Sequence, residues 1–281
     1  MDADLPVSLA VSRTRADRCP GALALHTAAD GMLCRIRLPG GELAPAALAG
    51  LAELSERFGE GGLELTSRGN VQIRAITAGD ATLVTEAVAD FGLLPSATHE
   101  RVRNIVASPL AGLDGKGSRL TPIVRELDRR LCGRAVLAEL PGRFLFGLDD
   151  GRGDMLALRP DAAAVAIDSA RWHVLPADVE VGSGAVVEVL LATAEAFLAE
   201  RSAQSSAAWR VAELPGGPES VGARVRRDLG LRATGSPRRP VLAGVAVPAE
   251  PVGPIRQADG RWAVIVLAPL GRLSAGQARL F

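Results

Sequence analysis

The sequence predicts an α+β protein in which a ferredoxin-like half-domain precedes an α/β domain and the start of a second half-domain. Three observations support this prediction. The first hundred residues follow a strand–helix–strand–helix order, the next 136 residues mix strands with long helices, and the last forty repeat the opening pattern. The chain has 281 residues, of which 48% are hydrophobic, so it can bury one large core or two ordinary ones.

The first block is expected over residues 19–97, after a disordered polar lead-in at residues 1–18. Residues 32–38 read as a strand because their side chains alternate. Cys34, Ile36 and Leu38 lie on one face, and Arg35 and Arg37 lie on the other. A turn at residues 39–41 then ends the strand.

Two helices are expected in this block. Pro45 suits the first turn of a helix, because its missing N–H group would have no partner there. An approximate apolar stripe follows at Leu48, Leu51, Leu54 and Phe58. Asp80 is a candidate N-cap of the second helix, which ends near Gly92.

Between these helices, residues 63–74 read as one half-buried strand. Its apolar face carries Leu65, Val71 and Ile73, and its polar face carries Thr66, Arg68, Asn70, Gln72 and Arg74. No acidic residue occurs from Thr66 to Arg74. Such a row suits a planar ligand with several carboxylates, because guanidinium groups match carboxylates in pairs. An ordinary solvent-exposed polar strand would also fit the pattern, and both interpretations stay open.

A right-handed crossover would make the strands at 32–38 and 63–74 parallel if they share a sheet. The two helices would then cover one face of that sheet and leave the other face free. Arg35, Arg37, Arg68 and Arg74 would converge on the free face. Four arginines together need a counter-charge, which a polycarboxylate ligand would supply.

An α/β domain is expected over residues 98–233. Thr121 and Pro122 open a helix, and further helices are expected at Ala185–Glu200 and Glu219–Leu229. The segment Asp149-Asp150-Gly151 indicates a turn. Strands are expected at Ala135–Leu140, Arg143–Leu148, Met155–Arg159 and Ala163–Ile167.

Residues 234–281 are expected to hold a linker and the beginning of a second half-domain. Strand-like segments occur at residues 241–247 and 262–267, and Pro269–Leu273 is similar to the turn that follows the first strand. The chain stops at Phe281, before a counterpart of residues 63–74. We therefore expect a truncated chain, the N-terminal portion of a longer protein.

Composition limits the classes of function. The formal net charge of +0 argues against broad binding to nucleic acid or to a membrane surface. Lys116 is the only lysine, so a single arginine is weak evidence of function. The three cysteines lack metal-site spacing and the three histidines are isolated, so no metal ligands are assigned. No segment has the features of a signal peptide or a membrane span, and a cytoplasmic protein is expected.

Three motifs together resemble the nitrite/sulfite reductase family. They are Arg35-Ile-Arg-Leu-Pro-Gly-Gly with Leu65-Thr-Ser-Arg-Gly-Asn-Val-Gln, Arg103-Asn104 followed by Pro109 and Gly112, and Leu140-Pro-Gly-Arg-Phe-Leu-Phe-Gly. The resemblance covers roughly residues 19–281. Within the family, Arg18-Cys-Pro-Gly and Asp30-Gly31 look most like the precorrin-3B synthases, which oxygenate the tetrapyrrole precorrin-3A in aerobic cobalamin biosynthesis.

The resemblance implies roles for particular residues. Arg103, Asn104 and Arg143 would be catalytic, with Arg143 at the position of an anion-binding lysine. Leu145 replaces a second lysine of the family, which disfavours reduction of sulfite or nitrite. The residues facing the tetrapyrrole would be Arg35 or Arg37, Thr66, Arg68, Asn70, Gln72 and Arg74.

The resemblance also implies cofactors and partners. The family uses a [4Fe-4S] cluster with siroheme or iron, and it takes electrons from a donor. The family's cluster cysteines, in Cys-x5-Cys and Cys-x3-Cys, have no counterpart in these 281 residues. Three hypotheses remain: a precorrin-3B synthase-like oxidoreductase, a fragment of a sulfite or nitrite reductase, and a non-catalytic tetrapyrrole-binding protein.

Overall fold

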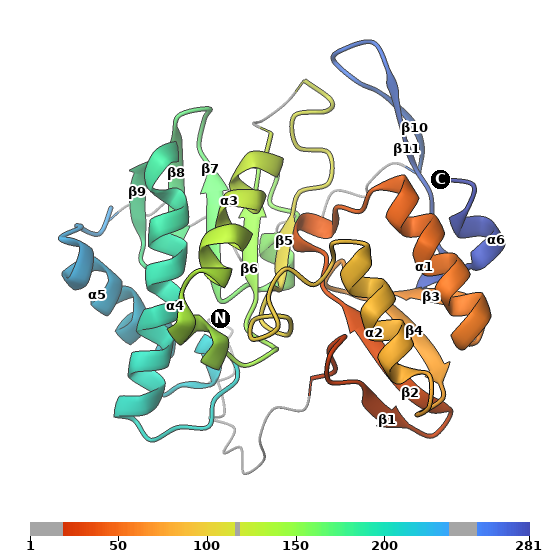
Figure 1. Ribbon diagram of the computed structural model, residues 1–281. Coiled ribbons are helices and arrows are strands. Elements are labelled where there is room, and N and C mark those ends of the chain that lie inside the picture. The colour runs from red at the N-terminus through yellow and green to blue at the C-terminus, as the bar shows by residue number, and fades with distance from the viewer. Residues whose placement is uncertain (1–18, 116–118, 236–251) are drawn as a thin grey trace, which may run out of the picture.

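The computed structural model describes residues 19–115, 119–235 and 252–281. The expected lead-in at residues 1–18 and the expected strand at residues 241–247 lie outside these ranges. Two α/β units stand side by side, each built on a five-stranded sheet with helices against it (Figure 1).

The sheet of the first unit has the strand order β1-β2-β4-β3-β12, and each neighbouring pair is antiparallel. Because β4 is antiparallel to both neighbours, β2 and β3 run parallel to each other with β4 between them. This is the split β-α-β arrangement of ferredoxin-like folds. The strands are β1 (His26–Ala28), β2 (Gly31–Ile36), β3 (Gly62–Leu65), β4 (Val71–Ile76) and β12 (Arg272–Ser274).

The prediction of one strand over residues 63–74 is wrong, because the chain reverses direction at residues 66–70. The hydroxyl of Thr66 accepts hydrogen bonds from the backbone N–H groups of Arg68 (3.3 Å) and Asn70 (3.1 Å). Gly69 adopts a left-handed φ of 66°, which glycine tolerates without strain. The parallel relation expected with β2 therefore holds for β3 alone, and β4 is antiparallel to it.

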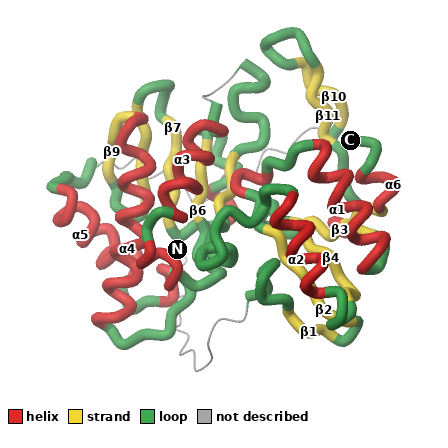
Figure 2. The backbone as a smooth tube through the Cα atoms, in the orientation of Figure 1, coloured by secondary structure: helices red, strands yellow, loops and turns green. Residues whose placement is uncertain are grey.

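Helices α1 (Pro45–Phe58) and α2 (Ala81–Asp90) cover one face of this sheet, as Figure 2 shows in red against yellow strands. Pro45 is the first residue of α1, as predicted. The helices bury Leu51 and Val84 against Ile36 and Ile73 of the strands, and all four side chains are fully inaccessible to solvent. The opposite face of the sheet therefore remains for a ligand or for the second unit.

The second sheet has the order β5-β6-β7-β8-β9, with β5, β6 and β7 parallel and the last two strands antiparallel. Its strands are β5 (Ile105–Ala107), β6 (Phe146–Asp149), β7 (Ala162–Ala166), β8 (Arg171–Leu175) and β9 (Val179–Gly182). Helices α3 (Thr121–Cys132) and α4 (Val186–Ala203) pack on it, and α5 (Gly217–Leu229) packs on α4. Within the described residues, no helix is long and apolar enough to cross a lipid bilayer.

Two strands predicted in this unit are wrong. Residues 135–139 and 156–158 form 3-10 helices instead. Arg159 has a left-handed φ of 51°, which ends the second 3-10 helix and prevents an extended strand there. The antiparallel strands β8 and β9 were not predicted, because charged and polar residues interrupt their apolar pattern.

The last described segment repeats the opening of the chain. Strands β10 (Gly253–Arg256) and β11 (Trp262–Ile265) form a hairpin like β1–β2, and a turn at Pro269–Gly271 follows it. Leu270 and Gly271 have φ values of 54° and 69°, while Gly40 and Gly41 have 69° and 70° in the turn after β2. A helix begins six residues after the first residue of each turn. Helix α1 begins at Pro45, after Pro39, and α6 (Ala275–Ala278) begins at Ala275, after Pro269.

Candidate functional site

The polar face of the first sheet includes Arg35, the next-to-last residue of β2. Arg35 Nε donates to Gln72 Oε1 on β4 at 2.6 Å, and Gln72 Nε2 donates to Glu64 Oε2 on β3 at 3.0 Å. Arg35 pairs with Gln72, and Gln72 with Glu64, in the strand register, so this row crosses three strands. Gln72 uses both ends of its side-chain amide to hold the row, which fixes where Arg35 points.

Arg37 is buried beyond the end of β2, with 3% of its surface exposed. Its Nε donates to the carbonyl of Arg101 at 3.2 Å, and its Nη2 donates to the carbonyl of Pro20 at 3.4 Å. Its Nη1 is buried and has no hydrogen-bond partner within the described ranges. Burial, and then the charge of Arg35, lower the pKa of Arg37 to about 10. A buried guanidinium nitrogen without an acceptor is an unsatisfied donor, which an anion would satisfy.

Arg68 stands at the tip of the β3–β4 hairpin and is half-buried. Among the residues that the structure describes, its side chain has no carboxylate in ion-pair range. Burial lowers the pKa of Arg68, and the nearby charges of Arg210 and Arg143 lower it further. Burial and the charge of Arg143 likewise lower the pKa of Arg35. These guanidinium groups therefore gather in one place.

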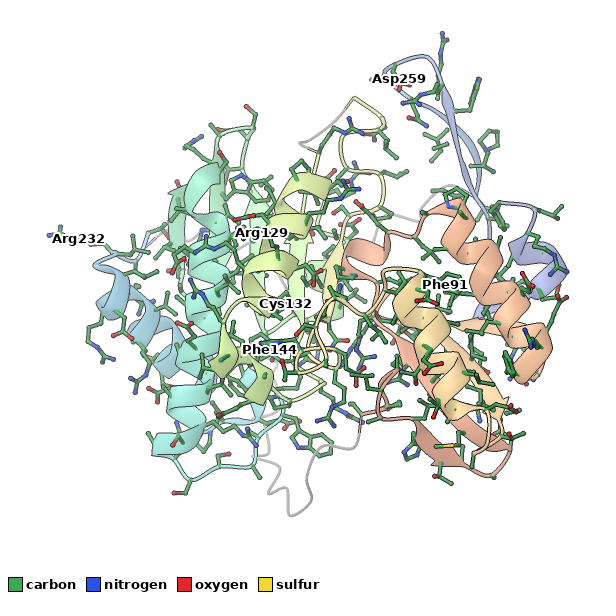
Figure 3. All side chains as sticks on the ribbon, viewed as in Figure 1. Phe91, Arg129, Cys132, Phe144, Arg232 and Asp259 are labelled. Atoms are coloured by element: carbon green, nitrogen blue, oxygen red, sulfur yellow. The ribbon has the colours of Figure 1, made fainter. Side chains whose placement is uncertain are left out.

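The second unit contributes two arginines, Arg143 and Arg210, to this group of guanidinium side chains. Arg143, just before β6, lies over the ring of Trp209, with its Cζ atom 5.1 Å from the ring centroid. Arg210 forms an ion pair with Asp161, with Nε and Oδ2 separated by 2.5 Å. Phe144, the next residue after Arg143, is labelled within the second unit in Figure 3, where it packs against Phe197 of α4. We call Arg35, Arg37, Arg68, Arg143 and Arg210 the arginine cluster.

Asp161 organises the second unit's side of the cluster. It is buried and accepts hydrogen bonds from the backbone N–H groups of Leu145 (2.9 Å) and Val211 (2.8 Å). It also forms the ion pair with Arg210. Burial raises its pKa to about 6 despite these favourable contacts. Leu145 has only 1% of its surface exposed, so its side chain belongs to the core.

Asn70 joins the hairpin tip to the second unit. Its Oδ1 accepts from the backbone N–H of Leu38 at 3.0 Å, and its Nδ2 donates to Asn104 Oδ1 at 3.3 Å. Asn104 Nδ2 donates in turn to the carbonyl of Gly142 at 2.8 Å, next to Arg143. Both asparagines are buried, so they position the cluster and do not themselves present a polar surface.

Two arginines predicted from the sequence are engaged elsewhere. Arg74 makes two 2.9 Å hydrogen bonds to Asp30 in the hairpin between β1 and β2. Arg103 is 5% exposed and makes two 2.7 Å hydrogen bonds to Asp128 of α3. The structure therefore brings Arg35, Arg37, Arg68 and Arg143 together, but neither Arg74 nor Arg103 joins them.

Sequence reasoning missed Arg210, Trp209 and Asp161. These three residues do not belong to any motif that was recognised in the sequence. They come near the arginines of the first unit only because the two units pack together. The available signal was Asp161 itself, an acidic residue directly before the run of alanines that forms β7. A lone carboxylate before a buried strand can indicate a buried ion pair.

The residues present fit one of the family's cofactors and not the other. A carboxylate-rich ring matches the arginine cluster, where Arg37 Nη1 lacks an acceptor within the described part of the chain. A [4Fe-4S] cluster needs four thiolates, and these 281 residues contain three cysteines. Cys34 is buried in β2, where burial raises the pKa of its thiol to about 12, far from that of a metal-binding thiolate.

Residues 26–91 match the family model "Nitrite/Sulfite reductase ferredoxin-like half domain". The chain thus contains a half-domain of this class, and the resemblance predicted from its sequence is confirmed. The matched residues include β2, both arginine-bearing segments of the first unit and the hairpin tip with Arg68.

The curated proteins to which the chain is similar include a precorrin-3B synthase, a nitrite reductase and a sulfite reductase. The chain is 32% identical over 142 residues to precorrin-3B synthase of a Sinorhizobium species, which is 50% of this chain and 30% of the relative. It is 28% identical over 131 residues to ferredoxin–nitrite reductase of Synechococcus elongatus, covering 44% and 26% of the two chains. It is 28% identical over 163 residues to a sulfite reductase [ferredoxin] of Mycobacterium tuberculosis, covering 57% and 29%.

The fold is similar to that of the Mycobacterium tuberculosis NirA protein, with a TM-score of 0.73 at 22% identity over 88% of this chain and 49% of that chain. This confirms the mixed α/β fold class. The chain thus matches about half the length of this solved structure and less than a third of each of these three curated relatives. The relatives are oxidoreductases, and the chain is related to that class of enzyme.

Proposed function

We propose that the arginine cluster binds the carboxylates of a tetrapyrrole ring, and that the chain is part of a precorrin-3B synthase-like oxidoreductase. The observation that carries this proposal is the pair Arg37 and Arg68. Both are at least half-buried, and neither has a carboxylate partner within the described ranges. Arginines that remain together without counter-charges destabilise the folded protein, and a polycarboxylate removes that cost.

Both units would contribute side chains that bind the ring. Arg35 and Arg68 would hold carboxylates from the side of the first sheet, with Gln72 keeping Arg35 in place through its 2.6 Å hydrogen bond. Arg143 would hold the opposite edge while it rests on Trp209. Thr66 and Asn70 contribute by shaping the tip that carries Arg68. Siroheme or precorrin-3A would meet the same donors, since both are carboxylate-rich methylated tetrapyrroles.

Leu145 favours the oxygenating branch over the reducing branch. Reduction of sulfite or nitrite requires cationic groups and protons at the bound anion. Residue 145 is an apolar side chain with 1% exposure, packed in the core, so it supplies neither. The 32% identity to a precorrin-3B synthase points in the same direction. The four-thiolate cluster, the electron donor and any residues outside these 281 would have to complete such an enzyme.

A sulfite or nitrite reductase is the second candidate, and the relatives named for ferredoxin-dependent reduction favour it. The two candidates predict different reactions. A longer form supplied with electrons and O2 should oxygenate precorrin-3A and leave sulfite and nitrite unchanged. Turnover of either anion at about one per second or more would favour the reductase. Binding of the ring without either reaction would favour a non-catalytic tetrapyrrole-binding protein.

The binding step is tested by titrating siroheme into the wild-type chain, Arg68→Ala and Arg68→Lys, with absorbance as the readout. One charge-assisted hydrogen bond contributes roughly 1.5–3 kcal/mol, so Arg68→Ala should weaken affinity about ten- to a hundredfold. Arg68→Lys should recover part of it, because lysine cannot make the two-pronged contact. Arg232→Ala, an exposed arginine labelled at the far end of the second unit in Figure 3, is the matched control.

Thermal melts of the same variants separate binding from folding. Since Arg68 has no ion pair within the described residues and stands near other arginines, its removal should leave the melting temperature unchanged or raise it slightly. If siroheme binds Arg68→Ala as tightly as the wild type, the arginine cluster is not the ring site. If affinity and melting temperature fall together, Arg68 has a structural role.

A further inference from the structure

A second charged cluster lies at the other end of the parallel strands. Ser108 follows the last residue of β5, and Asp149 is the last residue of β6. The carboxyl ends of parallel strands lie at one edge of a sheet, which is where open α/β sheets bind ligands. Arg143 and Asp161 precede β6 and β7, so the arginine cluster belongs to the opposite edge. The acidic edge is therefore separate from the proposed tetrapyrrole site.

Three carboxylates gather at this edge. Asp149, Asp150 and Asp154 are 1%, 8% and 6% exposed, and each brings an oxygen atom within 4.8 Å of the others. Arg152 is the cation beside them. It makes hydrogen bonds of 2.8 and 2.7 Å to Asp150 and reaches Asp114 at 3.5 Å. Within the described residues, this one guanidinium stands beside the three buried carboxylates, which leaves an excess of negative charge when all three are ionised.

The hydrogen bonds of the cluster satisfy most of its oxygens. Asp149 accepts from the backbone N–H groups of Gly151 and Gly153 at 2.9 Å each and of Met155 at 3.0 Å. Asp154 Oδ1 accepts from the hydroxyl of Ser108 at 2.6 Å and from the backbone N–H of Met155 at 2.9 Å. These contacts fix the carboxylates in place before any ligand arrives.

Asp154 Oδ2 is the exception. It is buried and has no hydrogen-bond partner among the residues that the structure describes. An unpartnered carboxylate oxygen beside two other buried carboxylates is costly unless a cation neutralises it.

We propose that Asp149, Asp150 and Asp154 bind one divalent cation of the hard, oxygen-preferring class, which includes Ca²⁺, Mg²⁺ and Mn²⁺. The donors are carboxylate oxygens, with the Ser108 hydroxyl alongside, and the cluster contains neither histidine nor cysteine. Such a donor set suits these ions better than Zn²⁺ or Cu²⁺. Asp154 Oδ2 supplies a ligand that no other group uses. The ion would hold the segment 149–155 against the end of β5.

Thermal melts of the chelator-treated full chain with Ca²⁺, Mg²⁺ or Mn²⁺ added singly test this proposal. A ligand about a hundredfold above its Kd raises the melting temperature of a protein of this size by roughly 5–10 °C. Isothermal titration calorimetry with the same ion should give about one ion per chain. No shift with any of the three ions overturns the proposal, since a site that holds only water would not respond to them.

Asp154→Asn identifies the site. Asparagine keeps the acceptor for Ser108 and Met155 but removes the unpartnered charge. We expect the variant to lose the cation-dependent shift and to melt at a higher temperature than the metal-free wild type, because a like charge is gone. Asp228→Asn, which changes an exposed aspartate on α5, should retain the full shift.

If Asp154→Asn still responds to the cation, the ion binds elsewhere and the proposal fails. If that variant does not fold, the stoichiometry of the wild type decides. Clearly less than one ion per chain in calorimetry then overturns the site. Neither experiment depends on tetrapyrrole binding, so failure here leaves the proposed function unaffected.

Discussion

The side-chain amide of Asn70 donates to that of Asn104 at 3.3 Å, and this hydrogen bond joins the hairpin that carries Arg68 to the strand that follows Arg103. Each asparagine also holds a backbone group of its own surroundings, at Leu38 and Gly142. The geometry of the arginine cluster thus depends on two buried amides that carry no charge.

The first prediction concerns this link. Asn70→Ala removes the acceptor for the backbone N–H of Leu38 and the donor to Asn104, both of which are buried. Leaving such groups without partners costs about 1–3 kcal/mol of unfolding free energy. Urea unfolding measures this loss, with Ser67→Ala as control because Ser67 is an exposed residue of the same tip. Equal stability of both variants would contradict the structural role of Asn70.

The second prediction separates Arg103 from Arg143. Arg103 is buried and Asp128 is partly buried, and removing Arg103 from their two-pronged ion pair leaves the Asp128 carboxylate uncompensated. Arg103→Ala should therefore lower the free energy of unfolding by about 3–5 kcal/mol. Arg143→Ala, which truncates an exposed side chain, should change stability by less than about 1 kcal/mol. Unfolding of both variants in guanidinium chloride measures these changes in the free energy of unfolding.

Replacing both partners, in Arg103→Met with Asp128→Leu, should recover part of the lost stability because no buried charge remains. If Arg103→Ala is as stable as the wild type, Arg103 is free to serve a ligand and the ion pair does not hold it in the folded protein.

The third prediction concerns pH. Burial raises the pKa of Asp161 to about 6 from its usual 3.8, so the folded protein holds this proton more tightly than the unfolded chain. The stability that comes from this proton is complete below about pH 4 and is lost as the pH rises to about 6. Linkage gives about 3 kcal/mol for a shift of about two pH units.

Asp161→Asn removes this titration. Urea unfolding at several pH values from 4 to 7 should show the wild type losing stability relative to the variant across that window. The difference between the two curves is the quantity to measure, since all other titrating groups are shared. Parallel curves would mean that Asp161 titrates normally.

The fourth prediction uses the repeated turn. Leu270 is 99% exposed and has φ and ψ of 54° and 20°, the left-handed region that glycine occupies at Gly40. Leu270→Gly should raise the free energy of unfolding by about 1 kcal/mol, because a side chain is strained in that conformation. Leu280→Gly, which is also exposed, should give no gain. A loss of stability in Leu270→Gly would contradict this account.

The sequence was sufficient for elements with a clear period or a strong terminal signal. Pro45 marked the start of α1, and the apolar pattern predicted α4 and β7 to within a few residues. The hairpin at residues 66–70 was missed because alternation continues through it. Side chains alternate in the same way on both sides of the turn, so their pattern gives no sign of the reversal. The antiparallel pairing of β3 with β4 and the hydrogen bonds to the Thr66 hydroxyl show it.

The candidate site was predictable where one strand carried it. Arg35 and Arg37 alternate with buried residues of β2, so their face could be read directly. Arg74 and Arg103 could not be assigned in this way, because their partners Asp30 and Asp128 come from other segments. Arg210 and Asp161 meet Arg68 only after two units pack, and a local pattern holds no information on that contact.

The pairing of β12 with β3 has a consequence for synthesis of the chain. Arg272 bonds to Glu64 across a separation of 208 residues, so the outer edge of β3 has no partner until residue 272 has been made. At roughly 5–20 residues per second, a ribosome needs about 10–40 s to cover that distance. Throughout this interval β3 presents an unsatisfied backbone edge, which other chains can pair with. The nascent protein therefore passes through a period of exposure to aggregation that its finished fold conceals.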